Sequence, residues 1–128
     1  MGGKSCYIRM VCIAVLLAQI GCHVPCDFAQ MCIYDGIFTR MGAGDDLAQG
    51  MSTFMQELHR TSRIIQAASP RALIALDELG RGTSTFDGVA IARATLSYLV
   101  QKVGCTTLFV THYPEVAQGV AETNAGCG

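Results

Sequence analysis

The chain has 128 residues, of which 51% are hydrophobic and 15% charged, and its net charge is −1. This composition suits a single domain with a large core and excludes an intrinsically disordered chain, which combines low hydrophobicity with high net charge. It also lacks the excess of basic residues by which a domain grips nucleic acid through charge.

A helix is predicted over Ser5 to Gln19, apolar on nearly every side, as is typical of a helix sandwiched within a core. Lys4 and Arg9 before the apolar run 10–18 imitate a signal peptide, and Gly21-Cys22 imitates a lipoprotein cleavage site. The run is far shorter than the roughly 20 residues needed to span a bilayer. We therefore expect a buried helix and no membrane partner.

The sequence holds seven cysteines and no C-x-x-C pair. Cys22, His23 and Cys26 have the look of metal ligands, but nothing nearby in the sequence completes a zinc site. The simpler interpretation is free, mostly buried thiols in a reducing compartment.

The next segment is predicted to contain a short strand, Met31 to Tyr34, and then a loop from Asp35 to Gly50. The loop is predicted because this stretch is rich in glycine and carries two adjacent aspartates. Long irregular loops in compact domains usually bind something, so this one is a candidate for function.

A second helix is predicted to begin at Ser52, a favourable N-cap residue, and to end before Pro70. Its apolar side chains recur at helical spacing, which predicts that they share one face. These side chains are Phe54, Met55, Leu58, Ile65 and Ala68.

Ala72 to Leu76 is a continuous apolar run, typical of a strand buried on both faces of a parallel sheet, and Thr106 to Val110 is predicted to be another buried strand. A third helix is predicted between them, from about Asp87 to Val103. Its inward side chains are expected to be Ala92, Leu96, Leu99 and Val103. The tail after Gly119 has no periodicity and is expected to fray. Strands alternating with helices predict an α/β fold with a parallel sheet.

Gly2-Gly3-Lys4-Ser5 opens the first helix and matches the second half of the phosphate-binding loop G-x-x-x-x-G-K-[ST]. Glycines let backbone N–H groups approach phosphate oxygens, and a helix N-terminus adds the positive end of its dipole. Lys4 is predicted to contact the β- and γ-phosphates and Ser5 to ligate Mg²⁺. The tetrapeptide alone is a weak signal, because it arises often by chance.

Two carboxylates, Asp77 and Glu78, end the apolar strand 72–76. Asp77 suits Mg²⁺, directly or through water, and Glu78 suits the orientation or deprotonation of an attacking water. Two solvated acids at a strand end are common, but the pair gains weight beside Gly-Lys-Ser. His112 follows the strand 106–110, where a histidine either donates to a γ-phosphate or is merely structural.

The segment Gly50 to Met55 opens the second helix, where the Ser52 hydroxyl and free N–H groups form another anion site. One nucleotide already has its phosphates held by Lys4 and Ser5. We therefore expect this second site to serve a nucleotide on a partner subunit.

Together these segments resemble the ATPase domain of the MutS family of DNA mismatch-repair proteins, which belongs to the ABC ATPase class. The resemblance covers residues 1 to about 118 and leaves 119–128 as a tail. It rests on Met1 to Ser5, Phe38 to Ala43, Ser52 to Met55, Asp77 to Thr85 and Thr111 to Tyr113. Asp35 to Met41 and Phe109 to Pro114 look most like the third eukaryotic homologue, a subunit of MutSβ, whereas Cys22 and Cys26 look more like the second.

The resemblance implies a P-loop NTPase of ABC-ATPase type whose sheet lacks its first strand, because the chain begins inside the phosphate-binding loop. It implies ATP binding by Gly2, Gly3, Lys4 and Ser5, and Mg²⁺ binding by Ser5 and Asp77. Glu78 becomes the catalytic carboxylate and His112 the γ-phosphate sensor. Ser52 reaches the partner's ATP, and the segment 80–85 lies at the dimer interface.

The same resemblance implies partners and a location. The expected partners are another MutS-family subunit, as a heterodimer, and mismatched or looped-out DNA bound through domains absent from this chain. The expected compartment is the nucleus, or the cytoplasm of a bacterium.

Two other interpretations compete with this one. A transport or chromosome-maintenance ABC ATPase should carry an L-S-G-G-Q-like signature, which residues 50–55 do not have. A non-hydrolysing interaction fragment of the same family is the alternative, because half a phosphate-binding loop should bind ATP poorly.

Overall fold

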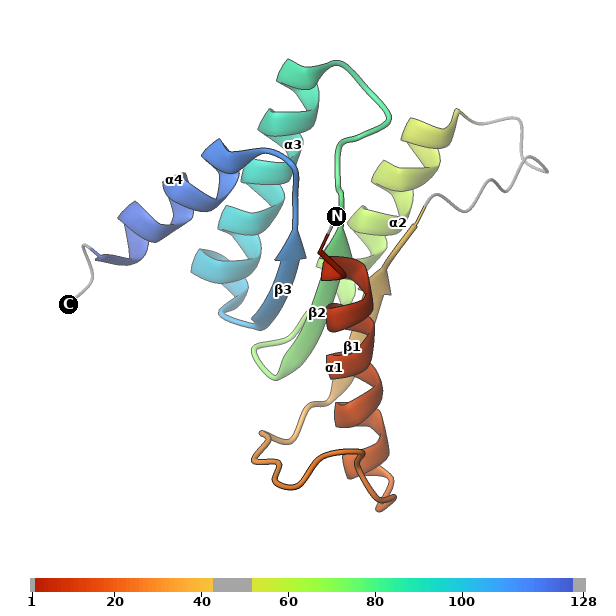
Figure 1. Ribbon diagram of the computed structural model, residues 1–128. Coiled ribbons are helices and arrows are strands. Elements are labelled where there is room, and N and C mark those ends of the chain that lie inside the picture. The colour runs from red at the N-terminus through yellow and green to blue at the C-terminus, as the bar shows by residue number, and fades with distance from the viewer. Residues whose placement is uncertain (1, 43–51, 126–128) are drawn as a thin grey trace.

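The computed structural model describes residues 2–42 and 52–125, in which helices and strands alternate along the chain (Figure 1). In order the elements are α1 (Lys4–Gln19), β1 (Gly36–Arg40), α2 (Thr53–Ala67), β2 (Ala72–Asp77), α3 (Thr85–Tyr98), the π-helical turn η2 (Leu99–Val103), β3 (Thr106–Val110) and α4 (Pro114–Ala125). The three strands form one parallel sheet in the order β1-β2-β3. The predicted α/β class with a parallel sheet is confirmed.

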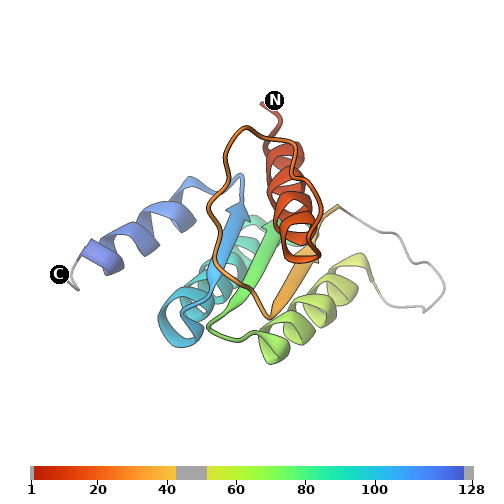
Figure 2. The same ribbon diagram turned by 90° about the horizontal axis from the view of Figure 1, so that it is seen from below.

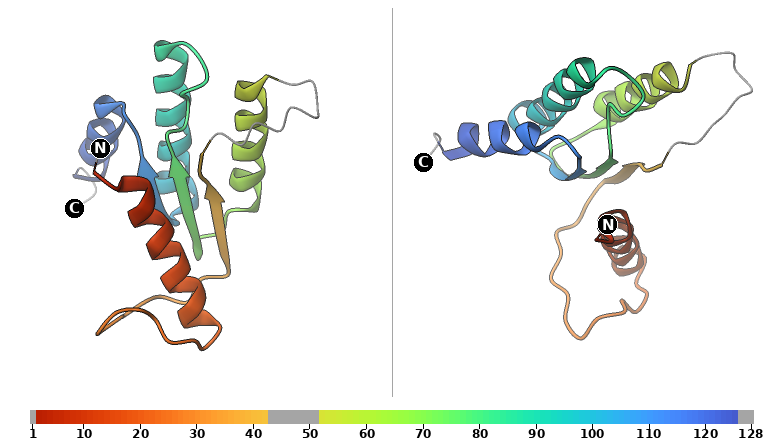
Figure 3. Two further views of the ribbon diagram at one scale, coloured as in Figure 1. Left: turned by 45° about the vertical axis from the view of Figure 1, so that its right-hand side comes forward. Right: turned by 45° about the horizontal axis from the view of Figure 1, so that its top comes forward.

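Helices cover both faces of this sheet. Helix α1 lies on one face, and α2 and α3 lie on the other (Figures 2 and 3). Successive side chains of a strand point to opposite faces, so β2 supplies both cores. Leu73 and Ala75 pack with Cys12 and Val15 of α1. The intervening residues of β2 pack with side chains of α2 and of η2, a cluster that includes Ile64, Ala72, Ile74, Leu76 and Leu99.

The two strands predicted over 72–76 and 106–110 are both present. Every residue of β2 is buried, because this strand is central in the sheet and covered on both sides. Continuous burial explains why the strand is apolar throughout rather than alternating.

The prediction of a strand over Met31 to Tyr34 is wrong. The structure places β1 five residues further on, at Gly36–Arg40, inside the predicted loop. Gly36 pairs with Ala72, and the register continues to Arg40, so long-range pairing with β2 decides the position. The rest of the predicted loop, residues 43–50, lies outside the described residues.

The predicted burial of the first helix holds for one face only. Ile8, Cys12 and Val15 are buried, whereas the opposite face carries large apolar side chains that are at least half exposed. These side chains are Tyr7, Met10, Ile13 and Leu16. The helix is therefore not enclosed by the described residues, because the sheet covers a single side of it.

Helix α2 begins as predicted, but its inward face is shifted. Gln56, Glu57, Thr61 and Ile64 are buried, whereas Met55 is 51% exposed. Polar side chains lie in this buried stripe because they have partners there, and apolar periodicity alone does not show such partners.

The C-terminal third follows the prediction more closely, with two differences. Helix α3 begins at Thr85, two residues early, because the Ser84 hydroxyl accepts a hydrogen bond of 3.3 Å from the Asp87 N–H. The predicted inward residues Ala92, Leu96 and Leu99 are buried, and Val103 packs beside the core. The tail expected after Gly119 begins inside α4, which extends to Ala125.

Candidate functional site

The predicted phosphate-binding residues lie at the carboxyl edge of the sheet. Asp77 is the last residue of β2, and His112 lies two residues after β3. Helix α1 packs against β2 and β3, and its first residues lie beside the carboxyl end of β2 (Figure 1). The start of α1 and the residues that follow β2 and β3 therefore lie at the same end of the sheet, where parallel sheets present their ligand sites.

The N-terminus of α1 has the geometry of an anion site. Gly3 is its N-cap residue in a left-handed conformation with φ of 66°, and no side chain of the described residues caps the helix. The first N–H groups of a helix have no partner within the helix, so here they are available to an anion. A Cβ at Gly2 or Gly3 would meet no described atom within 4 Å, so this approach is open.

Asp77 carries an unusual carboxylate. Its side chain is buried, and within the part of the chain that the structure describes its Oδ1 has no hydrogen-bond partner. A buried carboxylate oxygen without a partner is costly, because it has lost its water and gained nothing in return. Coordination to a hard cation such as Mg²⁺ would give this oxygen a partner.

Glu78 follows in a left-handed conformation with φ of 53°, which is rare for a residue other than glycine. Its N–H donates to the carbonyl of Val110 at 2.8 Å, which ties it to β3. Its carboxylate pairs with Arg81 at 2.6 Å and is about one-third exposed. The carboxylate thus stands at the sheet edge within reach of solvent.

His112 is exposed, and its ring lies 3.9 Å from that of Tyr113. Tyr113 is buried, and its hydroxyl donates to the carbonyl of Gly80 at 3.1 Å. His112 therefore contacts Tyr113, which is hydrogen-bonded to the loop after β2.

Ser52 is the N-cap of α2, and its hydroxyl accepts a hydrogen bond of 3.2 Å from the Met55 N–H, as predicted. Helix α2 also begins at the carboxyl edge of the sheet, on the β1 side (Figure 1). Gly50 and Met51, the first two residues of the predicted anion site 50–55, lie outside the described residues.

Sequence reasoning missed two residues at this edge, Arg40 and Glu57. Their side chains form an ion pair of 3.1 Å and are only 12% and 5% exposed. Glu57 shares a helical face with Thr61 and Ile64, both buried. A charge on a buried stripe requires a partner, but the burial of this stripe is not visible in the sequence, whose apolar residues predict a different inward face.

The cysteine-rich segment 22–32 does not form a metal-binding site with other described residues. Among residues 2–42 and 52–125, no three His, Cys, Asp or Glu side chains gather as metal ligands. Within the same ranges, no helix is both long and apolar enough to cross a membrane.

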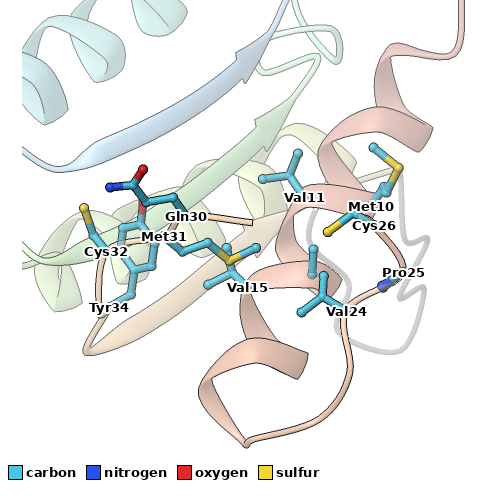
Figure 4. Close-up of a pocket in the computed structure, with 11 residues that line it drawn as sticks. Met10, Val11, Val15, Val24, Pro25, Cys26, Gln30, Met31, Cys32 and Tyr34 are labelled. Carbon is cyan, nitrogen blue, oxygen red and sulfur yellow. The ribbon is translucent and has the colours of Figure 1, made fainter. Parts of the chain in front are cut away.

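An apolar pocket of about 400 Å³ lies away from this edge, between α1 and the segment 24–34 (Figure 4). Met10, Val15, Pro25 and Tyr34 are among the side chains that line it, and all of them are uncharged. Such a lining does not suit a polyphosphate, so the carboxyl edge remains the candidate site despite the size of this pocket.

Comparison with known proteins decides the family. The family described as MutS domain V matches residues 1–125. This chain belongs to the MutS family. The resemblance to this family, which rests above all on the segment Asp77 to Thr85, is thereby confirmed.

Several MutS-family relatives are highly similar to the chain. It is 58% identical over 118 residues to DNA mismatch repair protein MSH3 of Arabidopsis thaliana, covering 92% of this chain and 11% of the relative. It is 57% identical over 118 residues to Msh3 of Homo sapiens, covering 92% and 10% respectively. It is 52% identical over 126 residues to MutS of Brevibacillus brevis, covering 98% and 14%. The MSH3 matches agree with the predicted likeness to the third eukaryotic homologue.

Proposed function

We propose that this domain binds and hydrolyses ATP as a P-loop ATPase domain of ABC type, and that hydrolysis serves the recognition of mismatched or looped-out DNA. The observation that carries the proposal is the unpartnered buried Oδ1 of Asp77. It lies at the sheet edge to which an uncapped helix N-terminus, at Lys4, also contributes. A Mg²⁺-bound triphosphate satisfies both features.

The N-terminus of α1 holds the phosphates in this proposal. The N–H groups after Gly2 and Gly3 donate to phosphate oxygens, and the ammonium of Lys4 neutralises the β- and γ-phosphates. The Ser5 hydroxyl and the Asp77 carboxylate hold Mg²⁺. When bound, the metal neutralises charge that develops on the transferred phosphoryl group.

Glu78 and His112 act on the reacting groups. Glu78 accepts a proton from, or orients, the water that attacks the γ-phosphate. Its carboxylate accepts a hydrogen bond of 2.6 Å from Arg81 and is about one-third exposed, which is compatible with contact to a water molecule. His112 donates to the γ-phosphate and so reports whether that group is present.

The proposed assembly with a partner subunit is based on the position of Ser52. In this proposal the phosphates of one nucleotide are held from α1 and β2, so Ser52 at the start of α2 is assigned to the ATP of a partner subunit. We propose another MutS-family subunit as that partner, and DNA contact through other parts of the protein, since the chain carries a net charge of only −1. The chain covers only 10% to 14% of its relatives, which leaves room for such parts. The proposed compartment is the nucleus for a eukaryotic source and the cytoplasm for a bacterial one.

The test places this chain in a longer protein. The matching segment of the human relative is exchanged for this chain, the chimera is assembled with its partner subunit, and ATP binding and Mg²⁺-dependent hydrolysis are measured. Lys4→Ala should weaken ATP binding more than tenfold. Lys102→Ala is the matched control, because Lys102 is an exposed lysine in η2, and it should change nothing.

Two results would contradict the proposal in different ways. A chimera that binds ATP without hydrolysing it would favour the non-hydrolysing interaction fragment. Equal behaviour of Lys4→Ala and Lys102→Ala would remove the helix N-terminus from the phosphate site.

A further inference from the structure

The buried carboxylate of Glu57 bonds directly to the loop that carries Glu78. Its Oε1 accepts a hydrogen bond of 2.7 Å from the Gly80 N–H, although the two residues are 23 positions apart. The side chain of Glu57 is 5% exposed, so this charge-assisted bond is shielded from water. Helix α2 therefore contacts the loop two residues beyond the proposed catalytic carboxylate.

Arg40 extends this contact to the other side of Glu78. One guanidinium nitrogen pairs with the Glu57 carboxylate at 3.1 Å, and the other donates to the backbone carbonyl of Asp77 at 2.6 Å. The Arg40–Glu57 pair thus holds the backbone at Asp77 and at Gly80, with Glu78 between the two.

The loop after β2 has an unusual backbone conformation that contacts from other segments must stabilise. Glu78 has φ of 53° and Gly80 has φ of 88°. A left-handed glutamate is strained and persists only where surrounding contacts determine it. Loss of the bond to Glu57 removes one of those contacts, so the loop is expected to relax toward ordinary backbone angles.

We infer that Glu57, together with Arg40, is a positioning residue that sets the direction of the Glu78 carboxylate. The inference rests on the proposed ATPase function. It also links α2, whose N-cap is Ser52, to the loop that carries Glu78. Because the Glu57 carboxylate accepts the Gly80 hydrogen bond, a movement of α2 would shift the position of that loop.

A stabilising ion pair alone does not account for this arrangement. Buried ion pairs contribute little net stability, since the cost of removing two charges from water offsets their attraction. Here both partners also form hydrogen bonds with backbone groups of Asp77 and Gly80, which lie on either side of Glu78 and Leu79. That pattern is suited to orientation, and orientation has large effects on rate, because a displacement of about 1 Å can cost about a hundredfold.

The experiment uses the chimera with the human relative described above. Glu57→Ala should lower kcat at least tenfold while KM for ATP changes less than threefold, because phosphate binding lies on α1. Glu57→Gln retains an acceptor oxygen for Gly80 and should recover most of that kcat. His59→Ala, an exposed residue on the same helix, is the matched control and should behave as the unchanged chimera.

A second measurement applies even where Glu57→Ala folds poorly. Hydrogen exchange of the peptide spanning residues 76–84 should be faster in Glu57→Gln than in the unchanged chimera, and faster still in Glu57→Ala. His59→Ala should not alter it.

The outcomes separate this inference from the proposed function. An unchanged chimera without hydrolysis would overturn the ATPase proposal, while hydrogen exchange would still report whether Glu57 holds the loop. Hydrolysis in the unchanged chimera with kcat within twofold in Glu57→Ala would overturn the inference alone. Unaltered exchange of residues 76–84 in Glu57→Ala would overturn it as well.

Discussion

The hydroxyl of Tyr113 donates a hydrogen bond of 3.1 Å to the carbonyl of Gly80 and so joins the two loops that leave β2 and β3. One loop carries Glu78 and the other carries His112, so the proposed catalytic carboxylate and phosphate sensor are tied through one buried contact. Gly88 of α3 lies against this contact, because a Cβ there would sit 2.4 Å from the Tyr113 hydroxyl and 2.5 Å from the Gly80 carbonyl.

Gly88→Ala should therefore destabilise the domain. Alanine in place of glycine within a helix is ordinarily favourable by about 1 kcal/mol. Here a real Cβ must displace buried backbone, and such overpacking costs roughly 1–3 kcal/mol. Gly119→Ala in α4 is the matched control, since its Cβ meets the mobile end of Arg93 at 3.3 Å. Chemical denaturation should show a lower midpoint for Gly88→Ala only, and equal midpoints would refute the close packing.

Glu78→Gln in a complete protein should preserve ATP binding and nearly abolish turnover. The amide keeps the shape of the side chain but loses the basic oxygen that positions water. Equilibrium nucleotide binding and steady-state hydrolysis are the paired measurements. Unchanged hydrolysis would remove Glu78 from the catalytic role and leave its pairing with Arg81 as a structural contact.

The 128-residue chain by itself should bind ATP weakly and show no mismatch-stimulated hydrolysis. The sequence holds only the second half of the motif G-x-x-x-x-G-K-[ST], at Gly2 to Ser5. Each missing charge-assisted hydrogen bond is worth roughly 1.5–3 kcal/mol, so two or three cost on the order of a hundredfold or more in affinity. Ser52 also requires a partner site. Calorimetric titration tests this, and micromolar binding together with turnover would show that Gly2 to Ser5 suffice.

The exposed thiols should be alkylated faster than the buried thiols near neutral pH. Burial raises the pKa of the Cys12 thiol above its usual value, which lowers its thiolate fraction as well as its accessibility. Cys105 is buried too, whereas Cys6, Cys22, Cys26 and Cys32 are exposed, so the prediction of mostly buried thiols is wrong for the described residues. Mass spectrometry after brief treatment with iodoacetamide should find the exposed thiols modified first.

Urea provides the control for the thiol measurement, because unfolding removes burial and should bring Cys12 to the same rate as the exposed thiols. Equally fast modification of Cys12 in the folded chain would contradict the packing of α1 on the sheet.

Local pattern alone determined the features that depend on neighbours in the chain. The apolar run 72–76 predicts a buried strand because each of its residues must avoid water on both faces. Ser52 predicts a helix start because its hydroxyl satisfies an N–H three residues on. The segments around Lys4 and Asp77 resemble those of the MutS family, and the family match over residues 1–125 confirms that resemblance.

Tertiary structure decided what depends on partners distant in sequence. Strand β1 lies at Gly36–Arg40 because its backbone pairs with β2, and glycine-rich composition does not reveal that pairing. Glu57 is buried because Arg40 and the Gly80 N–H supply its partners from two other segments. A charged side chain on a helix is ordinarily directed to solvent, and only the assembled fold provides the charge and hydrogen bond that make its burial favourable.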